Sequence, residues 1–505
     1  MEQHRSAQKP EAAGVKEWLG LTVLALATLL LALDFSVLHL ALPHVVADLR
    51  PSSTQQLWIL DSYGFMIAGF LVTMGTLGDR IGRKRLLLIG AGAFGLCSIA
   101  AAFAVSSEML IITRGLLGIA GATLMPSTLS LISNMFSQPR QRGIAIAVWL
   151  SCFSAGGAIG PLVGGIMLEW FWWGAVFLLG VPVMLLLLAT GPFLLPEYRD
   201  RDAGKLDLPS VLLSLVAILC TVYGLKEMAT YGFGAGPFIA VALGLGAGII
   251  FVQRQRAVRA PLLDLGLFRN RTFNGALIGL LAAVLTLGGF VLFFAQYLQL
   301  VEGLSPLQAG LWMIPYAAAN IIGALATPAL ARRAGTGRLI AGGLLVASIG
   351  YLSFNAAVWF GLPGLETMVS GSILIMFGLS PLMVLSTDLV IASAPPEKTG
   401  AASSLSEMSS ELGMALGIAV LGTVGTTVYR LIMADQVPDE MLPEAAAAAR
   451  DTLAGAVSVA AALPGHEMLA AAREAFMTGV QVVGGISTVL LLGLMLMYLT
   501  VLRDR

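Results

Sequence analysis

The stretch GTLGDRIGRKRLLL, residues 75–88, is the most specific motif in this chain. It lies between two long apolar segments and carries one acid, Asp79, beside a run of arginines and a lysine. An α-helix needs about 20 mostly apolar residues to cross the hydrocarbon core of a bilayer, and both flanking segments are of that length. The stretch is therefore predicted to be a short basic loop between two membrane-spanning helices.

The composition extends this interpretation to the whole chain. Of its 505 residues, 57% are hydrophobic and only 11% are charged, which is typical of a polytopic membrane protein. The net charge of zero argues against a nucleic acid partner. All three cysteines lie inside apolar segments without metal-ligand spacing, so neither a disulfide, a metal nor a cofactor is expected.

Counting apolar segments outward from the loop predicts fourteen spans. Arginine and lysine concentrate in alternate loops, and loops rich in these residues stay on the cytoplasmic side, which predicts that both termini are cytoplasmic. The Ala-rich segment 443–473 is interrupted by charges, Pro464 and Gly465. We interpret it as part of an outer loop with one or two short helices, because a fifteenth span would place the C-terminal arginines outside.

The spans group as six, two and six. We expect an N-terminal six-helix bundle at 17–195, two additional helices at 206–254 and a C-terminal six-helix bundle at 271–502, with the outer loop at 431–474. Residues 323–340 faintly repeat the pattern of the basic loop, and repeats of six helices are one architecture of secondary transporters. The predicted fold class is an all-α polytopic membrane protein with fourteen transmembrane helices, two six-helix bundles plus two additional helices.

Four carboxylic acids lie within the predicted spans: Asp34, Asp61, Glu407 and Glu411. A carboxylate in hydrocarbon costs several kcal/mol unless it is protonated, paired or facing water, so each is a candidate functional residue. Glu407 and Glu411 are one helical turn apart on one face. By their positions in the spans, Asp34 and Asp61 are expected toward the outer side and the two glutamates toward the inner side.

The basic loop resembles the signature loop of the major facilitator superfamily, G-x-L-a-D-r-x-G-r-k-x-x-l. An acid beside basic residues at this point can form a charge latch that is made in one conformation and broken in another. The fifth span, with SAGGAIGPLVGG, resembles the motif that the superfamily's drug/proton antiporters carry. These two motifs supply the candidate conformational switch, which comprises Gly75, Asp79, Arg80, Gly82, Arg83, Gly156, Gly160, Pro161, Gly164 and Gly165.

Further motifs resemble the fourteen-span drug/proton antiporter family. The first span reads LDFSVLHLALP, in which Ser36 and His39 stand where that family has Thr and Asn. WILDSY in the second span and SLSEMSSELGMALG in the thirteenth resemble the subgroup that exports quaternary ammonium compounds and cationic dyes. The fourth span resembles the family pattern R-x-x-q-G, with Leu117 in place of Gln; its Arg114 either extends to the membrane surface or faces the bundle beside a carboxyl.

The resemblance implies a secondary active multidrug efflux transporter in the bacterial cytoplasmic membrane, and a monomer. Its partners would be protons and lipophilic cations, which compete for the same acids. The proton-coupling candidates are Asp34, Asp61, Arg114, Glu407 and Glu411. The four acids are also substrate-binding candidates, together with aromatic, soft or polar residues that either line a pocket or merely pack: Tyr63, Trp149, Phe153, Phe294, Tyr297, Asn320 and Met408.

Three alternatives remain open. A transporter of another small metabolite, for instance an anion, would be expected to carry more basic residues at membrane depth than Arg114 alone. A non-transporting scaffold or receptor would use the 431–474 loop but leaves the acids without a role. Sodium could replace the proton, because carboxylates bind both. No nucleotide-binding loop or catalytic constellation points to an enzyme.

Overall fold

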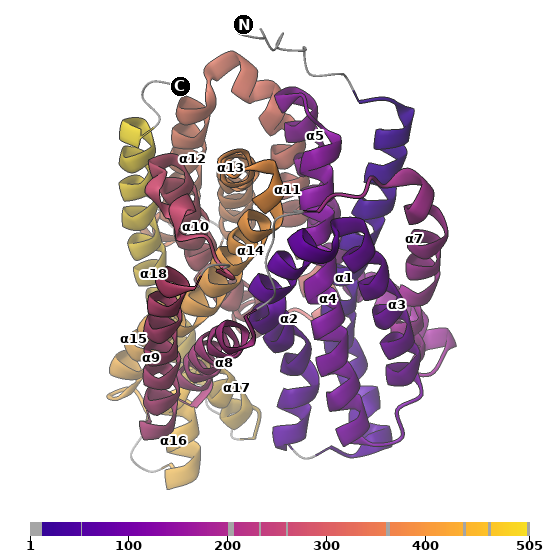
Figure 1. Cartoon of the computed structure of the whole chain (residues 1–505). Helices are drawn as coiled ribbons and strands as arrows, with labels where there is room; N and C mark the ends of the chain where they lie inside the picture. The colour runs from indigo at the N-terminus through magenta and orange to yellow at the C-terminus, as the bar shows by residue number, and fades with distance from the viewer. Residues whose placement is uncertain are drawn as a thin grey trace, which may run out of the picture.

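The computed structural model describes residues 13–51, 53–199, 207–231, 234–258, 261–359, 364–437, 441–462 and 466–501. All regular structure within these ranges is helical. Figure 1 shows long helices that run through the molecule, the N-terminal ones in indigo and purple beside the C-terminal ones in orange and yellow. Among the described residues, fourteen stretches are long and apolar enough to cross a membrane, which confirms the predicted count and fold class.

The N-terminal half forms six spans around its own buried apolar core. Helix α1 packs on α5, and α2 and α3 both pack on α4. The short α6 and α7 together make the sixth span. The helices are α1 (Val15–Leu49), α2 (Ser53–Ile81), α3 (Arg83–Ala102), α4 (Ser107–Met135), α5 (Pro139–Trp170), α6 (Ala175–Leu178) and α7 (Gly180–Leu194).

The C-terminal half surrounds a second buried core. Two of its spans contain a π-helical turn, η2 after α10 and η4 between α14 and α15. Such turns widen a helix locally and are frequent at functional sites. The elements are η1 (Leu265–Arg269), α10 (Arg271–Gln296), η2 (Tyr297–Val301), α11 (Pro306–Ala334), α12 (Thr336–Trp359), α13 (Gly364–Ala392), η3 (Pro396–Lys398), α14 (Thr399–Leu416), η4 (Gly417–Leu421), α15 (Gly422–Met433) and α18 (His466–Val501).

Two additional helices, α8 (Leu208–Tyr231) and α9 (Ala235–Ala257), form a hairpin between the halves in sequence. A bidentate ion pair closes it, because Arg254 donates to both oxygens of Asp207 at 2.7 and 2.9 Å. This bonding holds the pKa of the Asp207 carboxyl at about 2. Helix α8 contacts α2 and η4. In α9, only 17% of the residues in its apolar stretch are buried, so most of α9 lies on the outer surface of the protein.

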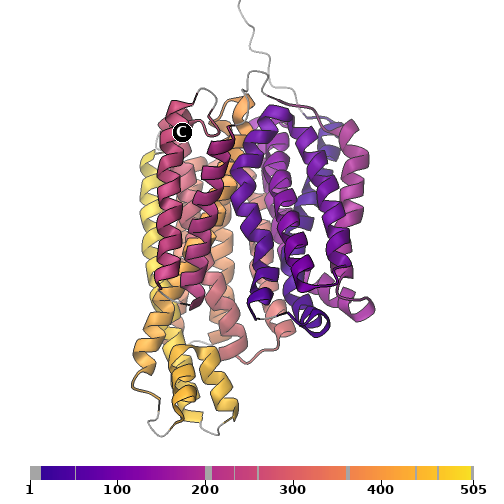
Figure 2. The same cartoon turned by 60° about the horizontal axis from the view of Figure 1, so that its bottom comes forward.

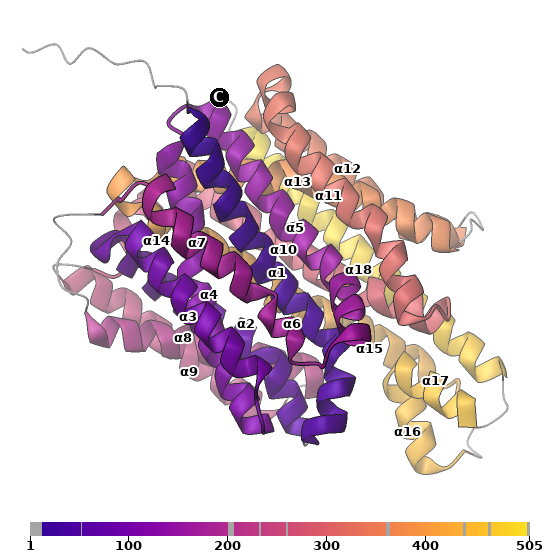
Figure 3. The ribbon, with the colours of Figure 1, turned by 90° about the vertical axis from the view of Figure 1, so that its right-hand side faces the viewer.

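Two short helices, α16 (Pro443–Asp451) and α17 (Leu453–Ala462), occupy the segment before α18. Figures 2 and 3 show them together at the end of the molecule opposite to the start of α1. The Tyr429 hydroxyl donates to the Ala449 carbonyl at 2.8 Å, and Arg430 pairs with Asp451 at 2.7 Å. Neither helix is long enough to cross a bilayer. The side of the membrane on which they lie stays a prediction.

Candidate functional site

Asp34 and Arg114 form an ion pair inside the N-terminal half. Nη1 of Arg114, on α4, donates to Oδ2 of Asp34, on α1, at 2.7 Å. The arginine is completely buried and Asp34 is 8% exposed. Each charge therefore depends on the other, because an unpaired charge at this depth is strongly destabilising. Of the two orientations that the sequence left open for Arg114, the structure adopts the one that faces the bundle.

Tyr63 of α2 completes this cluster in the N-terminal half. The Arg114 guanidinium lies 4.5 Å from the centre of the Tyr63 ring and 5.8 Å from that of Phe177. A cation is attracted to the face of an aromatic ring, so the rings supply part of what water would supply outside. Among the described residues, neither the Tyr63 hydroxyl nor Nε and Nη2 of Arg114 has a hydrogen-bond partner. The cluster thus keeps free donors at a buried position.

Glu407 and Glu411 lie on α14, in the C-terminal half. Helix α14 contacts α2 and α4, the helices that carry Tyr63 and Arg114. Glu407 and Glu411 also interact with each other. The expected separation of the four acids into an outer and an inner pair stays a prediction. Asp61 is half-buried on α2, two residues before Tyr63, and so points in another direction around the helix.

The glycines of α5 position α1, which carries Asp34. A side chain at Gly156 would collide with the Leu29 carbonyl, and one at Gly160 would collide with Ser36. Gly164 faces Val37 on the same side of α5. Spacing of four residues puts these glycines on one face and lets the two backbones approach closely. Gly165 faces open space, and the side chain of Pro161, like that of His39, lies outside the described residues.

Asn320 connects the two halves. Its amide on α11 donates to the Ser154 hydroxyl on α5 at 2.7 Å. Its side-chain oxygen accepts from Ser380 of α13 at 3.1 Å. Phe153, which precedes Ser154, is 37% exposed. Asn320 therefore lies at a contact between the two halves.

The remaining candidate side chains have contacts of their own. The Trp149 indole donates to Thr128 at 3.1 Å within the N-terminal half. Phe294 stacks on Phe290 with ring centres 5.0 Å apart, and the Tyr297 hydroxyl bonds Glu302. Met408 lines a separate cavity beside α8 and α9. Helix packing accounts for the first three positions in this conformation, and their part in substrate binding stays a prediction.

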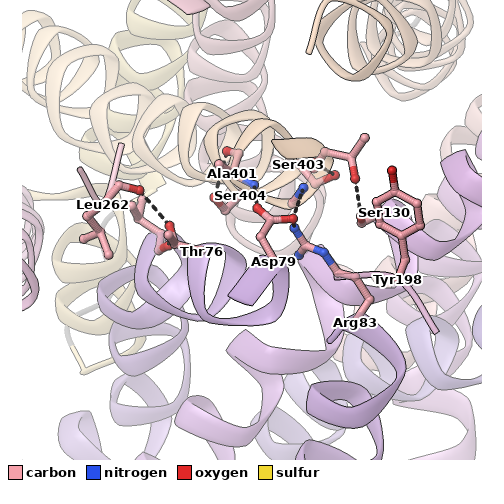
Figure 4. A network of polar contacts seen from close by, with 12 residues as sticks. Thr76, Asp79, Arg83, Ser130, Tyr198, Leu262, Ala401, Ser403 and Ser404 are labelled. Carbon is pink, nitrogen blue, oxygen red and sulfur yellow. Dashed lines mark hydrogen bonds and ion pairs between the residues drawn. The ribbon is translucent and has the colours of Figure 1, made fainter. Parts of the chain in front are cut away.

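The basic loop meets the N-terminus of α14, as Figure 4 shows. The Asp79 carboxylate accepts hydrogen bonds from the backbone amides of Gly400 and Ala401, at 3.4 and 3.0 Å, and forms an ion pair with Arg83. The first amides of a helix have no partner within the helix and readily bind an anion. Asp79 thus joins the end of α2 to the other half of the molecule.

The neighbours of Asp79 fit closely around it. Gly75 lies against Ser404 and the Gly400 carbonyl, where no side chain would fit. Gly82 has a φ of +109°, which favours glycine, and it sits against Glu197. Arg80 donates to the Pro261 carbonyl at 3.3 Å.

Three further polar contacts at this end were not predicted from the sequence. Arg142 of α5 pairs with Asp388 of α13 at 2.6 Å, and Ser130 of α4 bonds Thr399 of α14 at 2.7 Å. Lys398 pairs with Asp264 at 2.6 Å and, by this hydrogen bond, holds the pKa of that carboxyl below its usual value. In the sequence, Arg142 and Lys398 are two of the basic residues that concentrate in alternate loops. Their acidic partners are far away along the chain, so no local pattern could have revealed the pairs.

Comparison with known proteins agrees with this architecture. The family model described as Major Facilitator Superfamily matches residues 24–418. The chain is 43% identical to the "Multidrug efflux pump LfrA" of Mycolicibacterium smegmatis over 485 residues, which cover 94% of both chains. It is 35% identical to the "Methyl viologen resistance protein SmvA" of Salmonella typhimurium, over 91% of this chain and 93% of that protein.

Solved structures share the fold at low identity. The human organic anion transporter MFSD10 has a TM-score of 0.60 at 17% identity, covering 94% of this chain and 99% of that chain. A bacterial homolog of the human lysosomal transporter Spinster has a TM-score of 0.57 at 19% identity, covering 98% and 99%. With the family model spanning most of the chain and relatives matching nearly all of it, this protein belongs to the major facilitator superfamily.

Proposed function

We propose that this chain is a secondary active multidrug efflux transporter that exchanges protons for lipophilic organic cations, such as quaternary ammonium biocides and cationic dyes. The observation that carries the proposal is the buried Asp34–Arg114 pair with Tyr63 beside it, against whose helices α14 packs with its two glutamates. The names of two relatives support the substrate class, since one is a multidrug efflux pump and methyl viologen is an aromatic dication.

Competition for negative charge is the basis of the proposed exchange. Glu407 and Glu411 repel each other when both are ionised, so binding either a proton or an organic cation relieves the repulsion. Asp34 behaves differently, because Arg114 already neutralises it. A proton that binds Asp34 removes the counter-charge of Arg114, and the freed guanidinium then repels a cation bound nearby. We therefore assign proton coupling first to Asp34, share cation binding and protons between the two glutamates, and keep Asp61 as a further candidate for both.

In alternating access, the two halves of the molecule would move relative to each other as two rigid bodies. We propose the bundles 17–195 and 271–502 as these bodies, with 206–254 as an added hairpin and 431–474 as an outer loop. The contacts of Asp79 with Gly400 and Ala401, and of Arg142 with Asp388, join the halves at the end of the basic loop in this conformation. Opening that end requires breaking them. We further propose a monomer in the bacterial cytoplasmic membrane with both termini inside.

The energetics limits the stoichiometry. Moving one elementary charge across a membrane potential of 100 mV is worth about 2.3 kcal/mol. Exchange of one proton for a monovalent cation moves no net charge and draws on the pH gradient alone. Two protons per cation would add the electrical potential, and four acids are sufficient for that.

Ethidium efflux in everted membrane vesicles, measured across pH, tests the proposal. We expect Asp34→Asn to abolish proton-driven efflux, and Glu407→Gln and Glu411→Gln to weaken ethidium binding and transport. Asp61→Asn should have the smallest effect. Glu169→Gln, at the exposed end of α5, is the matched control and should transport normally. Proton-coupled efflux by all four variants would refute the proposed sites. Efflux driven by a sodium gradient in place of a pH gradient would refute the proton as the coupling ion.

A further inference from the structure

A cavity of about 650 Å³ lies between the α8–α9 hairpin, α2 and α14, apart from the cluster around Asp34. Binding sites for small molecules commonly measure about 300–1,000 Å³, so a ligand of that size fits. Its walls are mostly apolar and include Ile218 of α8, Ile249 of α9, Val72 of α2 and Leu405 of α14. The candidate substrate residue Met408 also faces this cavity.

Buried hydrogen bonds hold in place the segment between α9 and η1, which forms one side of the cavity. Gln255 is buried, and its side-chain oxygen accepts from the backbone amides of Leu262 and Leu263 at 2.6 and 3.2 Å. Its amide nitrogen donates to Ser210 at 2.8 Å. These bonds hold the connection against the hairpin, so that Leu263 lines the cavity. The wall is therefore fixed by buried hydrogen bonds.

Polar groups of the cavity include Arg256 and Gln253, both near the C-terminal end of α9. Arg254, two residues earlier, is occupied by Asp207. Arg256 is exposed, and no carboxylate among the described residues lies within ion-pair distance of it. One cation near the end of a span, next to an apolar cavity, is complementary to a molecule with an anionic head and a hydrocarbon tail.

We infer that this cavity binds an anionic phospholipid, with hydrocarbon between the hairpin and α14 and the phosphate at Arg256 and Gln253. Because α9 is buried over only a small part of its length, lipid can enter from the bilayer. A lipophilic cation entering the same way would meet the positive charge of Arg256, which disfavours it. Since α14 lines the cavity and its N-terminus holds Asp79, the lipid would stabilise the contact between the halves.

Native mass spectrometry and thermal unfolding of the purified full chain test the inference. Dioleoylphosphatidylglycerol is added to delipidated protein in detergent, with dioleoylphosphatidylcholine in parallel. We expect phosphatidylglycerol to raise the unfolding temperature more than phosphatidylcholine. Arg256→Ala should weaken phosphatidylglycerol binding about fivefold, the loss expected for one basic residue at a membrane surface. Arg333→Ala, an exposed arginine at the end of α11 that does not line the cavity, is the control and should bind normally.

A second variant tests the apolar part. Gly248 lines the cavity, and the nearest atom to an added Cβ there is 3.8 Å away, on Ala217. Gly248→Leu should fill the space and abolish the stabilisation by phosphatidylglycerol, while its unfolding temperature without lipid stays at or above that of the wild type. Equal stabilisation by both lipids, normal lipid binding by Arg256→Ala, or displacement of bound lipid by tetraphenylphosphonium would overturn the inference. None of these readouts requires transport, so failure of the proposed efflux function would be seen separately.

Discussion

At the scale of single residues, the buried pair of Asp34 and Arg114 gives the sharpest expectation. Asp34→Asn leaves a fully buried guanidinium without its counter-charge, and breaking a buried pair in this way costs about 3–5 kcal/mol. We expect a large fall in unfolding temperature in detergent together with loss of proton-driven efflux. The double variant Asp34→Asn, Arg114→Gln should recover much of the stability but none of the coupling. Recovery of both would show that the pair serves only the fold.

Two variants of Tyr63 distinguish the contribution of its ring from that of its hydroxyl. The ring faces Arg114, whereas the hydroxyl has no hydrogen-bond partner among the described residues. Tyr63→Leu should therefore cost about 2 kcal/mol, the value for a desolvated cation–π contact, and Tyr63→Phe should cost little. Thermal unfolding measures both. A Tyr63→Phe variant of normal stability that has lost proton-driven efflux would instead give the hydroxyl a part in proton transfer.

At the scale of helices, the spans could be predicted because lipid leaves the backbone few choices. A segment within hydrocarbon must satisfy its amides and carbonyls internally, so apolar length alone identifies a helix. The π-helical turns η2 and η4 and the division of the sixth span into α6 and α7 were not predicted. These interruptions depend on packing against neighbouring helices, which one-dimensional periodicity does not contain.

The contact of α5 with α1 offers a matched pair of neighbouring glycines. A methyl group at Gly156 would press on the Leu29 carbonyl and lie 3.0 Å from the Ala32 Cβ, whereas nothing lies within 4 Å of one at Gly157. We expect Gly156→Ala to destabilise the protein by about 1–3 kcal/mol, because overpacking separates the helices. Gly157→Ala should be neutral or slightly stabilising. Unfolding temperatures that fell equally would contradict the close approach of α1 and α5.

At the scale of the whole molecule, the Arg142–Asp388 pair should shift the balance between conformations. Its side chains are 16% and 20% exposed, so solvent screens it and its loss is worth about 1 kcal/mol. Asp388→Asn should raise the population open at this end about fivefold relative to the closed one. The charge swap Arg142→Asp, Asp388→Arg should restore the balance.

Spin-label distances between Arg140 and Arg333, in a chain whose three cysteines are replaced, report this population. Both positions are exposed, one at the start of α5 and one at the end of α11. An unchanged distance distribution in Asp388→Asn would show that the pair does not hold the halves together.

The spans, the basic loop and the membrane acids could be identified from the sequence alone, because each depends on local composition or on a short motif. Only the tertiary structure decided the partners. Asp34 meets Arg114 across 80 positions, and Arg142 meets Asp388 across 246. It also packs α14 against α2 and α4 and turns Met408 toward the cavity beside α8 and α9. Such pairings depend on how distant helices are rotated and packed against each other, which cannot be predicted from the sequence of any one helix.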